Sequence, residues 1–430
     1  MPFLKPYYSY RLIVYNTVFS REREIGYNRD PSAAIKGRRR RSIRELATTA
    51  VCFAGLCLFL YLEQRSVRRH VRRIPLRVAV TGTRGKSTVT RMIAAALKEA
   101  GFLVLAKTTG SKPVFILPDG REEEVVRRGL PTIMEQKRLL RKAANLGVRV
   151  MVTEMMSIHP ECLAVESGRL IQPQYLVITN ARLDHREEMG QTKSEIARSL
   201  GVAILPGTQV FVPESERYPE LEAVAGRVGA KIIAPETGGA GSFLDQDSCL
   251  AAAVASHLGV SEAVARQGSL GAAPDFGSLK VWEATLGVPP TNWTLVSAFA
   301  ANEPESSRLV IAYLREKLFL NGRPLIGLVN FRADRGDRTR QWLEAHAQGF
   351  FSRFQRVYVV GAHIHSLDVR RITSRVPSLT PLPDRIPSVI MEKIAAGEHG
   401  APVFIGLGNI GGVGEALVEH WQTIGKPHAL

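Results

Sequence analysis

From residue 77 onward, short apolar runs alternate with longer stretches that carry apolar residues at helical spacing. The first run, Val78–Val80, is β-branched and typical of a buried parallel strand, and the pattern that opens at Lys86 predicts a helix ending near Gly101. This alternation predicts an α/β domain built on a parallel sheet. Further strands are predicted at 103–106, 148–153, 175–179, 208–213 and 231–234, and helices at 132–146 and 248–258.

A second α/β pattern follows a glycine-rich segment at 271–277, which we interpret as a hinge. It does not repeat the first pattern at any fixed period. We therefore expect two domains after the N-terminal region, at 63–272 and at 273–430. The second domain has strand patterns at 295–299, 325–329, 356–360 and 402–405, and a helical pattern at 306–317.

Before the first domain, Leu46–Leu62 is a run of 17 residues without a charge, which is the lower limit for crossing a bilayer core. Arg44 precedes the run, and five arginines follow it between residues 65 and 73. A buried core helix is the alternative, but arginines at both ends suit lipid headgroups better. The pattern predicts a membrane anchor helix at 46–62, preceded by a basic arm at 1–45.

Charge is distributed unevenly along the 430 residues, whose formal net charge is +17. The stretch up to Arg77 holds 17 Lys and Arg against 5 Asp and Glu, so most of the excess lies outside the two α/β domains. A nucleic-acid-binding protein would more often carry its basic residues on a folded face, so we expect no nucleic-acid partner. The four cysteines show no paired spacing, which argues against disulfides and structural zinc and fits a reducing compartment.

The turn after the first predicted strand carries the clearest chemistry. Two glycines allow a tight turn with outward-facing amides, and a Gly-Lys-Ser sequence opens the following helix, where the helix dipole attracts anions. Lys86 would reach the outer phosphates of a nucleotide, and the Ser87 hydroxyl would bind Mg²⁺. An ordinary strand-to-helix turn is the alternative, because Val80 stands where the general phosphate-binding loop has its first glycine. The strand before and the helix after favour an ATP site formed by Gly82, Thr83, Arg84, Gly85, Lys86, Ser87 and Thr88.

Polar residues directly follow two other predicted strands. Glu154 comes after 148–153, and Asp184-His185 comes shortly after 175–179. Ligands of open α/β sheets bind at the carboxyl ends of the strands, so these side chains are placed to meet the phosphates. Glu154 and His185 are therefore predicted to contact Mg²⁺ or to position water, the alternatives being a surface carboxylate and a structural histidine. A nucleotide-binding body must face the cytoplasm, which orients the predicted anchor.

In the second domain, the segment Asn330–Arg338 follows a strand and is dense in charge. Arg332, Arg338 and Asp334 in this segment can bind carboxylates or phosphates if they face a cleft, although a solvated loop is the alternative. A glycine pattern at 406–411 matches the dinucleotide fingerprint, but such a site needs a further strand and an acidic residue about 20 positions on, and the stretch up to Leu430 leaves no room for both. We therefore expect a glycine turn at a sheet edge rather than an NAD site.

The phosphate-loop sequence TGTRGKS resembles that of the Mur ligases and folylpolyglutamate synthases. With seven further motifs, the chain from about residue 69 to residue 421 resembles the ATP-dependent ligase subunits of poly-γ-glutamate synthases, the CapB/PgsB type of the Mur ligase superfamily. The motifs are KTTG at 107–110, EQK at 135–137, TEMMSIHPE at 153–161, LDHREEMG at 183–190, FAANEPESS at 299–307, NFRADRGDRT at 330–339 and GLGNIGG at 406–412.

The resemblance implies a P-loop-type Mur-ligase central domain, a Rossmann-like C-terminal α/β domain and one N-terminal hydrophobic anchor helix. It implies an acid–amino-acid ligase of the cell membrane that uses ATP and Mg²⁺, passes through an acyl phosphate and forms poly-γ-glutamate for a capsule. Ser87, Glu154 and His185 would surround Mg²⁺, with Lys86 and Arg332 as further catalytic residues. Asn302, Asp334 and Arg338 would contact the nucleotide from the second domain. The implied partners are glutamate or the growing polymer and a small multi-span membrane subunit.

The chain departs from the pattern of the superfamily at three positions. Many Mur ligases carry a carbamylated lysine where Leu200 stands here, an asparagine where Asp247 stands, and an arginine where Lys280 stands. Two alternatives therefore stay open: a related ligase that acts on another amino acid or acceptor, and a membrane-tethered nucleotide switch that forms no bond.

Overall fold

The computed structural model of the chain describes residues 31–110, 112–127, 129–235, 243–275, 278–318, 322–362, 364 and 379–428. It divides into two units, one up to Ser66 and one from Val67 to Leu430. Most of the basic arm predicted at 1–45, namely residues 1–30, lies outside the described residues.

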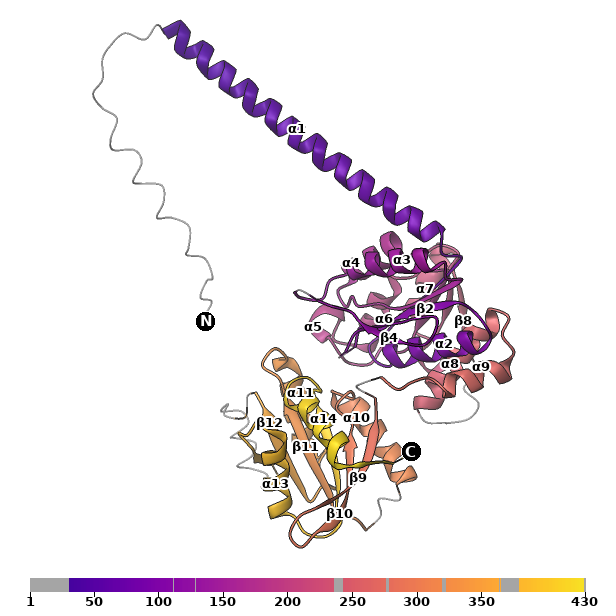
Figure 1. Cartoon of the computed structure of the whole chain (residues 1–430), viewed down its shortest axis with the longest axis vertical. Helices are drawn as coiled ribbons and strands as arrows, with labels where there is room; N and C mark the ends of the chain where they lie inside the picture. The colour runs from indigo at the N-terminus through magenta and orange to yellow at the C-terminus, as the bar shows by residue number, and fades with distance from the viewer. Residues whose placement is uncertain are drawn as a thin grey trace, which may run out of the picture. The chain divides into compact units, whose positions relative to one another are not determined.

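Helix α1 (Pro31–Arg72) contains the whole predicted anchor run and continues beyond it at both ends (Figure 1). An 18-residue window within its stretch Ile43–Arg72 has a mean hydropathy of 1.8, and α1 is the one helix in the described part of the chain that is long and apolar enough to cross a membrane. Large apolar side chains such as Leu46 and Phe53 are about two-thirds exposed on it. A helix that exposes apolar side chains in this way is a candidate membrane anchor.

Residues from Val67 to Arg77 belong to the second unit. Val67 and Val71 are buried in its core, together with Ile74. The guanidinium of Arg77 donates to the backbone oxygens of Val71 (3.2 Å) and Ile74 (2.7 Å), which lie at the end of α1. The Arg77 guanidinium also donates to the backbone oxygens of Ile171 and Gln172. One half-buried arginine therefore hydrogen-bonds to the ends of two helices.

The first sheet of this unit has eight strands in the order β4-β3-β2-β5-β1-β6-β7-β8. Six of them are parallel, as the alternating pattern predicts, and β3 and β4 form an antiparallel hairpin at one edge. The strands are β1 (Leu76–Thr81), β2 (Val104–Lys107), β3 (Val114–Ile116), β4 (Glu122–Glu124), β5 (Val150–Glu154), β6 (Tyr175–Ile178), β7 (Gln209–Phe211) and β8 (Lys231–Ile233).

Helices cover both faces of this sheet (Figure 1). One face packs on α2 (Lys86–Glu99), α8 (Phe243–His257) and α9 (Glu262–Leu270) through residues such as Ile93, Val254 and Ala265. The other face packs on α3 (Glu135–Leu146), α4 (Pro160–Val165), the π-helix Glu166–Ile171, α6 (Lys193–Gly201) and α7 (Pro219–Val228). A short helix α5 (Arg186–Met189) and a 3₁₀ turn (Glu214–Glu216) lie in the connections.

The second sheet has seven strands in the order β13-β12-β11-β14-β10-β9-β15. Five are parallel to one another. At one edge, β9 pairs antiparallel with β10, and β15 pairs antiparallel with β9. The strands are β9 (Lys280–Leu286), β10 (Thr291–Ser297), β11 (Leu325–Phe331), β12 (Arg356–Gly361), β13 (Leu379–Pro381), β14 (Val403–Gly408) and β15 (Lys426–His428). One face packs on α10 (Pro304–Lys317) and α11 (Gly336–Ala347), and the other on α13 (Pro387–Gly397) and α14 (Val413–Ile424).

Two layered α/β sheets with a preceding long apolar helix confirm the predicted fold class. The dinucleotide-like glycines at 406–411 form the end of β14 and the turn into α14, as expected for a glycine turn. The predicted place at a sheet edge is wrong, because β14 is the middle strand of the seven.

Close packing of α9 on α2 gives a test of the fold. A Cβ added to Gly268 in α9 would lie 2.6 Å from Cα of Ala96 and 3.0 Å from the backbone oxygen of Ala95. Gly268→Ala should therefore lower the free energy of unfolding by about 1–3 kcal/mol, measured by denaturant titration. Gly226→Ala is the matched control, because nothing lies within 4 Å of that position in α7. The control should raise stability by about 0.5–1 kcal/mol, and equal effects of the two substitutions would contradict this packing.

Candidate active site

The turn after β1 has the backbone of a phosphate-binding loop. Gly82 and Gly85 have positive φ angles of 129° and 77°, and α2 begins directly after them at Lys86. A Cβ on Gly82 would lie 2.1 Å from Oγ1 of Thr179 and 3.0 Å from its backbone nitrogen. Only glycine fits this position, because both the angle and the space exclude a side chain.

The loop is held in shape by the residues that follow β6. The side-chain oxygen Oδ1 of Asn180 accepts from Thr83 Oγ1 (2.7 Å) and from the backbone nitrogen of Arg84 (3.1 Å). Asn180 Nδ2 donates to the backbone oxygen of Arg84 (3.1 Å), and Thr179 Oγ1 donates to the same oxygen. The amides at the start of α2 are thus fixed before any anion arrives.

Lys86 folds back over this loop. Its Nζ donates to the backbone oxygen of Gly82 (2.8 Å) and, more weakly, to that of Thr83 (3.4 Å). Burial lowers the pKa of the Lys86 ammonium, and the Glu154 carboxylate opposes this shift. The arrangement places a cation directly above a nest of backbone amides, as binding of a phosphate chain requires.

Glu154 ends β5, next to β1, and its carboxylate reaches the loop. Its Oε2 accepts from Ser87 Oγ (2.7 Å) and from the backbone nitrogen of Thr109 (2.6 Å). Within the part of the chain that the structure describes, its other oxygen Oε1 accepts no hydrogen bond. A Cβ on Gly110 would lie 2.9 Å from Ser87 Oγ, so a glycine keeps the space beside this pair open. A hydroxyl and a carboxylate oxygen around such a space fit a hard divalent cation such as Mg²⁺.

Behind Glu154 lies a buried polar network that the pattern analysis does not reveal. Gln136 Nε2 donates to the backbone oxygen of Glu154 (3.2 Å) and to Oε1 of Glu166 (2.7 Å). Glu166 also accepts from the backbone nitrogens of Met156 (3.1 Å) and Ser157 (3.0 Å), which follow Glu154 in the chain. The network fixes the backbone on both sides of the active-site carboxylate.

A second buried pair lies on the neighbouring strand. Lys107 ends β2, has no exposed surface, and its Nζ lies 3.2 Å from Oε2 of Glu135. Glu135 is also paired with Arg127, whose Nε lies 2.7 Å from Oε1. The KTTG and EQK motifs of the sequence therefore meet here through a buried ion pair. Only Lys107, directly after the apolar run at 103–106, carries a signal in the sequence.

His185 follows β6 with a positive φ angle of 51°. Burial lowers the pKa of His185 to about 4, the nearby Arg338 and Lys86 add to the effect, and Asp184 opposes it. The imidazole is therefore neutral at physiological pH, which is the form that binds metal ions. Its Nε2 lies 3.4 Å from Oδ2 of Asp184.

Asp184 lies between two arginines, one from each sheet. Arg84 Nη2 is 2.9 Å from its Oδ2, and Arg338 Nη2 is 3.3 Å from its Oδ1. Burial by itself would raise the pKa of the Asp184 carboxyl, but Arg84 and Arg338 hold it well below its usual range. Arg338 lies in the first turn of α11, and its Nη1 donates to Oδ1 of Asn409 (3.1 Å).

Asn302 lies before α10 and meets the phosphate loop from the second sheet. Its Oδ1 accepts from Arg84 Nη2, and Arg84 Nη1 donates to the backbone oxygen of Ala300 (3.3 Å). The next residue, Glu303, caps α10 by accepting from the backbone nitrogens of Glu305 and Ser306. The structure thus brings Asn302 and Arg338 to the loop, as the sequence predicts for residues of one site.

Arg332 and Asp334 are not brought to the loop. They form an exposed pair, with Arg332 Nε donating to Asp334 Oδ1 (2.9 Å) and Nη2 to Oδ2 (2.8 Å). Arg332 instead lines a separate cavity of about 360 Å³ at the ends of β11, β12 and β14, with Arg385 and the glycine turn that opens α14. Both oxygens of Asp334 are occupied by this arginine.

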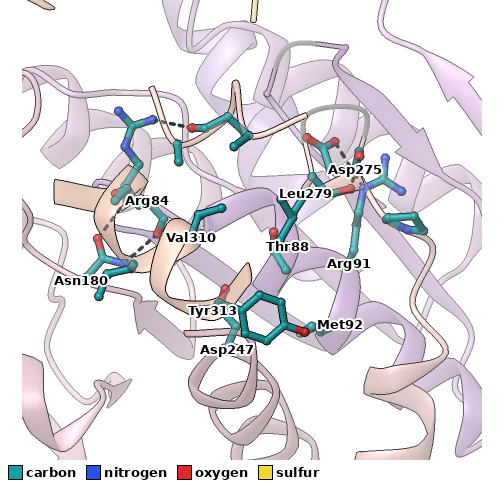
Figure 2. Close-up of a pocket in the computed structure, with 18 of the residues that line it drawn as sticks. Arg84, Thr88, Arg91, Met92, Asn180, Asp247, Asp275, Leu279, Val310 and Tyr313 are labelled. Carbon is teal, nitrogen blue, oxygen red and sulfur yellow. Dashed lines mark hydrogen bonds and ion pairs between the residues drawn. The ribbon is translucent and has the colours of Figure 1, made fainter. Parts of the chain in front are cut away.

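A pocket of about 340 Å³ opens beside the phosphate loop. Figure 2 shows Arg84 and Asn180 on one side of it and Arg91 with Asp275 on the other. Thr88 also lines the pocket, whereas the other loop residues Thr83, Lys86 and Ser87 are not among its walls. Its apolar wall can stack a flat ring and is formed by Met92, Leu279, Ala298, Ala301, Leu309, Val310 and Tyr313.

Asp247 is the acidic residue of this pocket on the side of α8. Burial raises the pKa of the Asp247 carboxyl to about 7, and Arg182 opposes the shift in part. A Cβ on Gly85 would lie 3.1 Å from Oδ2 of Asp247, so the Asp247 carboxyl packs on the phosphate loop itself.

Family models match both α/β regions of the chain. The Mur ligase middle domain matches residues 80–201, and the poly-γ-glutamate synthase CapB C-terminal domain matches residues 285–424.

Two curated proteins are similar over most of the chain. The PGA synthase CapB of Bacillus subtilis is 30% identical over 371 residues, which are 83% of this chain and 93% of that protein. The capsule biosynthesis protein CapB of Bacillus anthracis is 31% identical over 311 residues, which are 70% of this chain and 66% of that protein.

Solved structures share the fold. A bifunctional folylpolyglutamate synthase/dihydrofolate synthase of Yersinia pestis, complexed with AMPPNP and a manganese ion, has a TM-score of 0.61 at 15% identity and covers 85% of this chain and 97% of its own. MurF of Acinetobacter baumannii has a TM-score of 0.59 at 17% identity and covers 82% of this chain and 79% of its own. These likenesses show the fold, and the two family models and the two relatives place the chain in the CapB family of Mur-ligase-type enzymes, the ATP-dependent amide ligases.

Proposed function

We propose that the chain is a membrane-anchored ligase that forms poly-γ-glutamate by activating a γ-carboxylate with ATP. The observation that carries the proposal is the phosphate loop after β1, with Lys86 folded over it and the Ser87–Glu154 pair at its side. Both relatives are CapB proteins, one named a PGA synthase and the other a capsule biosynthesis protein, which supports glutamate as the amino acid.

In this proposal the triphosphate lies on the amides of Gly82 to Thr88, and the nucleoside extends into the 340 Å³ pocket. Lys86 and Arg84 neutralise the outer phosphates from the central domain, at 63–272. Asn302 and Arg338 do so from the C-terminal domain, at 273–430. Arg332, which lines the separate cavity, and Asp334, with which it pairs, are assigned to the substrate side of the site rather than to the nucleotide.

A divalent cation, which we take to be Mg²⁺, fits the oxygens of Ser87 and Glu154 and the neutral imidazole of His185. When bound, it would neutralise phosphate charge. The chain's own part is to orient these donors: Thr109 fixes one oxygen of Glu154, and Gln136 fixes its backbone.

The reaction joins a carboxylate to an amine in two transfers. An oxygen of the γ-carboxylate attacks the terminal phosphorus of ATP, the bond from that phosphorus to the bridging oxygen breaks, and ADP leaves. The amine nitrogen of the next glutamate then attacks the acyl carbon and loses a proton, the carbon–oxygen bond to phosphate breaks, and phosphate leaves. Positioning and charge neutralisation supply most of the rate enhancement in such transfers.

Helix α1 is proposed as the anchor, with its apolar run at 46–62 in the cell membrane and the catalytic domains in the cytoplasm, where ATP is. A small multi-span membrane subunit is the proposed partner for exporting the polymer.

Glutamate-dependent release of ADP tests the proposed function. Membranes that contain the chain should release ADP from ATP and MgCl₂ only when L- or D-glutamate is added, and Lys86→Ala should reduce this release at least about 100-fold. Lys98→Ala is the control, because Lys98 is an exposed residue at the other end of the same helix. ADP release that glutamate leaves unchanged, or that survives in Lys86→Ala, would rule the assignment out.

Asp247 predicts a pH dependence of nucleotide binding. With a pKa of about 7, the carboxyl is neutral below that pH and becomes an anion above it, next to the phosphate loop. The affinity for ATP should therefore fall about three- to tenfold from about pH 6 to about pH 8, measured by calorimetry at fixed Mg²⁺. Asp247→Asn should remove this decrease, whereas Asp245→Asn, at an exposed position one half-turn earlier, should keep it. An identical pH profile for Asp247→Asn and the unaltered chain would refute this role.

The apolar face of α1 predicts membrane association. Leu56→Arg combined with Leu60→Arg should move the chain from the membrane pellet to the supernatant, because each charge at the centre of a bilayer costs about 2.5–3.5 kcal/mol. Leu146→Arg, at an exposed position at the end of α3, is the control and should stay in the pellet. If the double variant pelleted as fully as the control after a carbonate wash, α1 would not be the anchor.

A further inference from the structure

The acidic residue between the two arginines has a geometry that differs from that of a metal ligand. Asp184 is 1% exposed, and both of its carboxylate oxygens are engaged: Oδ2 by Arg84 (2.9 Å) and Oδ1 by Arg338 (3.3 Å). A carboxylate shared by two guanidinium groups offers little to a cation. Its neighbour His185, at 3.4 Å from Oδ2, is the residue of this turn that remains suited to a metal.

The two arginines come from different sheets and are each fixed on their own side. Arg84 follows β1, in the loop braced by Asn180. Arg338 starts α11 and is held by Asn409, whose backbone oxygen accepts in turn from Asn330 Nδ2 (2.5 Å). Asp184 therefore forms one ion pair with the phosphate loop, through Arg84, and one with the second sheet, through Arg338.

The two guanidinium groups keep donors that no protein group accepts. Arg84 and Arg338 share the Asp184 carboxylate, and Arg84 Nε lies 4.0 Å from Oε1 of the buried Glu303, too far for a hydrogen bond. Within the described residues, Nε of Arg84 and Nε of Arg338 have little exposed surface and make no hydrogen bond. Buried donors without an acceptor are costly, so an anion that accepts from them would complete the cluster.

We propose that Asp184 is a positioning residue that holds Arg84 and Arg338 together above the phosphate loop, so that the C-terminal domain closes in one fixed place over the terminal phosphate. This rests on the proposed function, since the completing anion is the phosphate chain of ATP. Asp184 acts only through the two arginines and does not touch the reacting atoms.

A second contact between the same two parts of the chain serves as a control. Lys193 Nζ in α6 lies 2.7 Å from Oε1 of Glu305 in α10, and both side chains are about 40% exposed. Such an exposed pair contributes little to stability. Glu305→Gln therefore removes one ion pair between the two domains without touching the buried cluster.

The test measures turnover, ATP binding and the protease sensitivity of the segment at 271–277, which we interpret as a hinge, in the full-length chain. Asp184→Asn should lower kcat about 10- to 100-fold while the Kd for ATP changes less than about threefold, and chymotrypsin should cut the hinge at least about three times faster. Asp184→Glu, which keeps the charge, should recover part of kcat. Glu305→Gln should match the unaltered chain in all three measurements.

A double-variant cycle shows whether Asp184 acts through Arg338. The combination Asp184→Asn with Arg338→Gln should be no slower than the worse single variant, because residues that act as a unit are not additive. If the losses in kcat of the two single variants multiply in the double variant, the proposal is overturned. A normal kcat and hinge sensitivity in Asp184→Asn would overturn it as well. If Asp184→Asn does not fold, as judged by thermal unfolding, Asp184→Glu and Arg338→Lys take its place in the cycle. The hinge measurement does not use glutamate, so it separates a failure here from a failure of the proposed function.

Discussion

The contact on which the site depends is the one between the turns that follow β1 and β6. Gly82 packs so closely on Thr179 that no side chain fits, and Asn180 holds the backbone of Thr83 and Arg84 from both sides. Since β1 lies between β5 and β6 in the sheet, Glu154 and His185 reach the same edge. A parallel sheet thus delivers an anion nest, a carboxylate and an imidazole to one place without a long loop.

The first sheet's contribution is rigid, whereas the second sheet reaches the site through charged side chains. Arg338, Asn302 and Glu303 meet Asp184 and Arg84, whereas the ion pairs Lys193–Glu305 and Lys112–Glu419 lie on the surface. Surface pairs of this kind are worth about 0–1 kcal/mol. The buried cluster is therefore the contact in which binding of an anion can decide how firmly the two domains are joined.

The sequence identified the rigid part of the site more fully than the rest, for a physical reason. Glu154 directly follows an apolar run, and Lys86 and His185 follow such runs after a short turn, so the pattern alone places all three beyond the carboxyl ends of strands. The charged segment at 330–338 could not be divided in this way. Arg332 turns to Asp334, two residues away, while Arg338 enters α11 and faces Asn409, which is distant in sequence. Local pattern carries no information about such a choice.

The remaining misses have the same origin. Glu135 and Gln136 lie in the helix predicted at 132–146, Lys107 directly follows the strand predicted at 103–106, and no element is predicted at Glu166. The contacts of these four residues with one another depend on how the elements pack. The strands β3, β4 and β15, at or next to the sheet edges, have only three residues each, which is too short for an alternation to be recognised. Fold class follows from periodicity, whereas edges and buried polar pairs follow from tertiary contacts.

The buried network behind Glu154 explains how a carboxylate at a strand end can keep one orientation. Ser87 and Thr109 occupy one of its oxygens, and Gln136, itself held by Glu166, fixes the backbone. Burying Glu166 without partners would be costly, but it accepts from two backbone amides and from Gln136, so its cost is offset. The carboxylate can therefore keep its second oxygen directed at a ligand without reorganising when the ligand arrives. On the first sheet, the phosphate loop and this carboxylate are therefore both fixed by protein contacts.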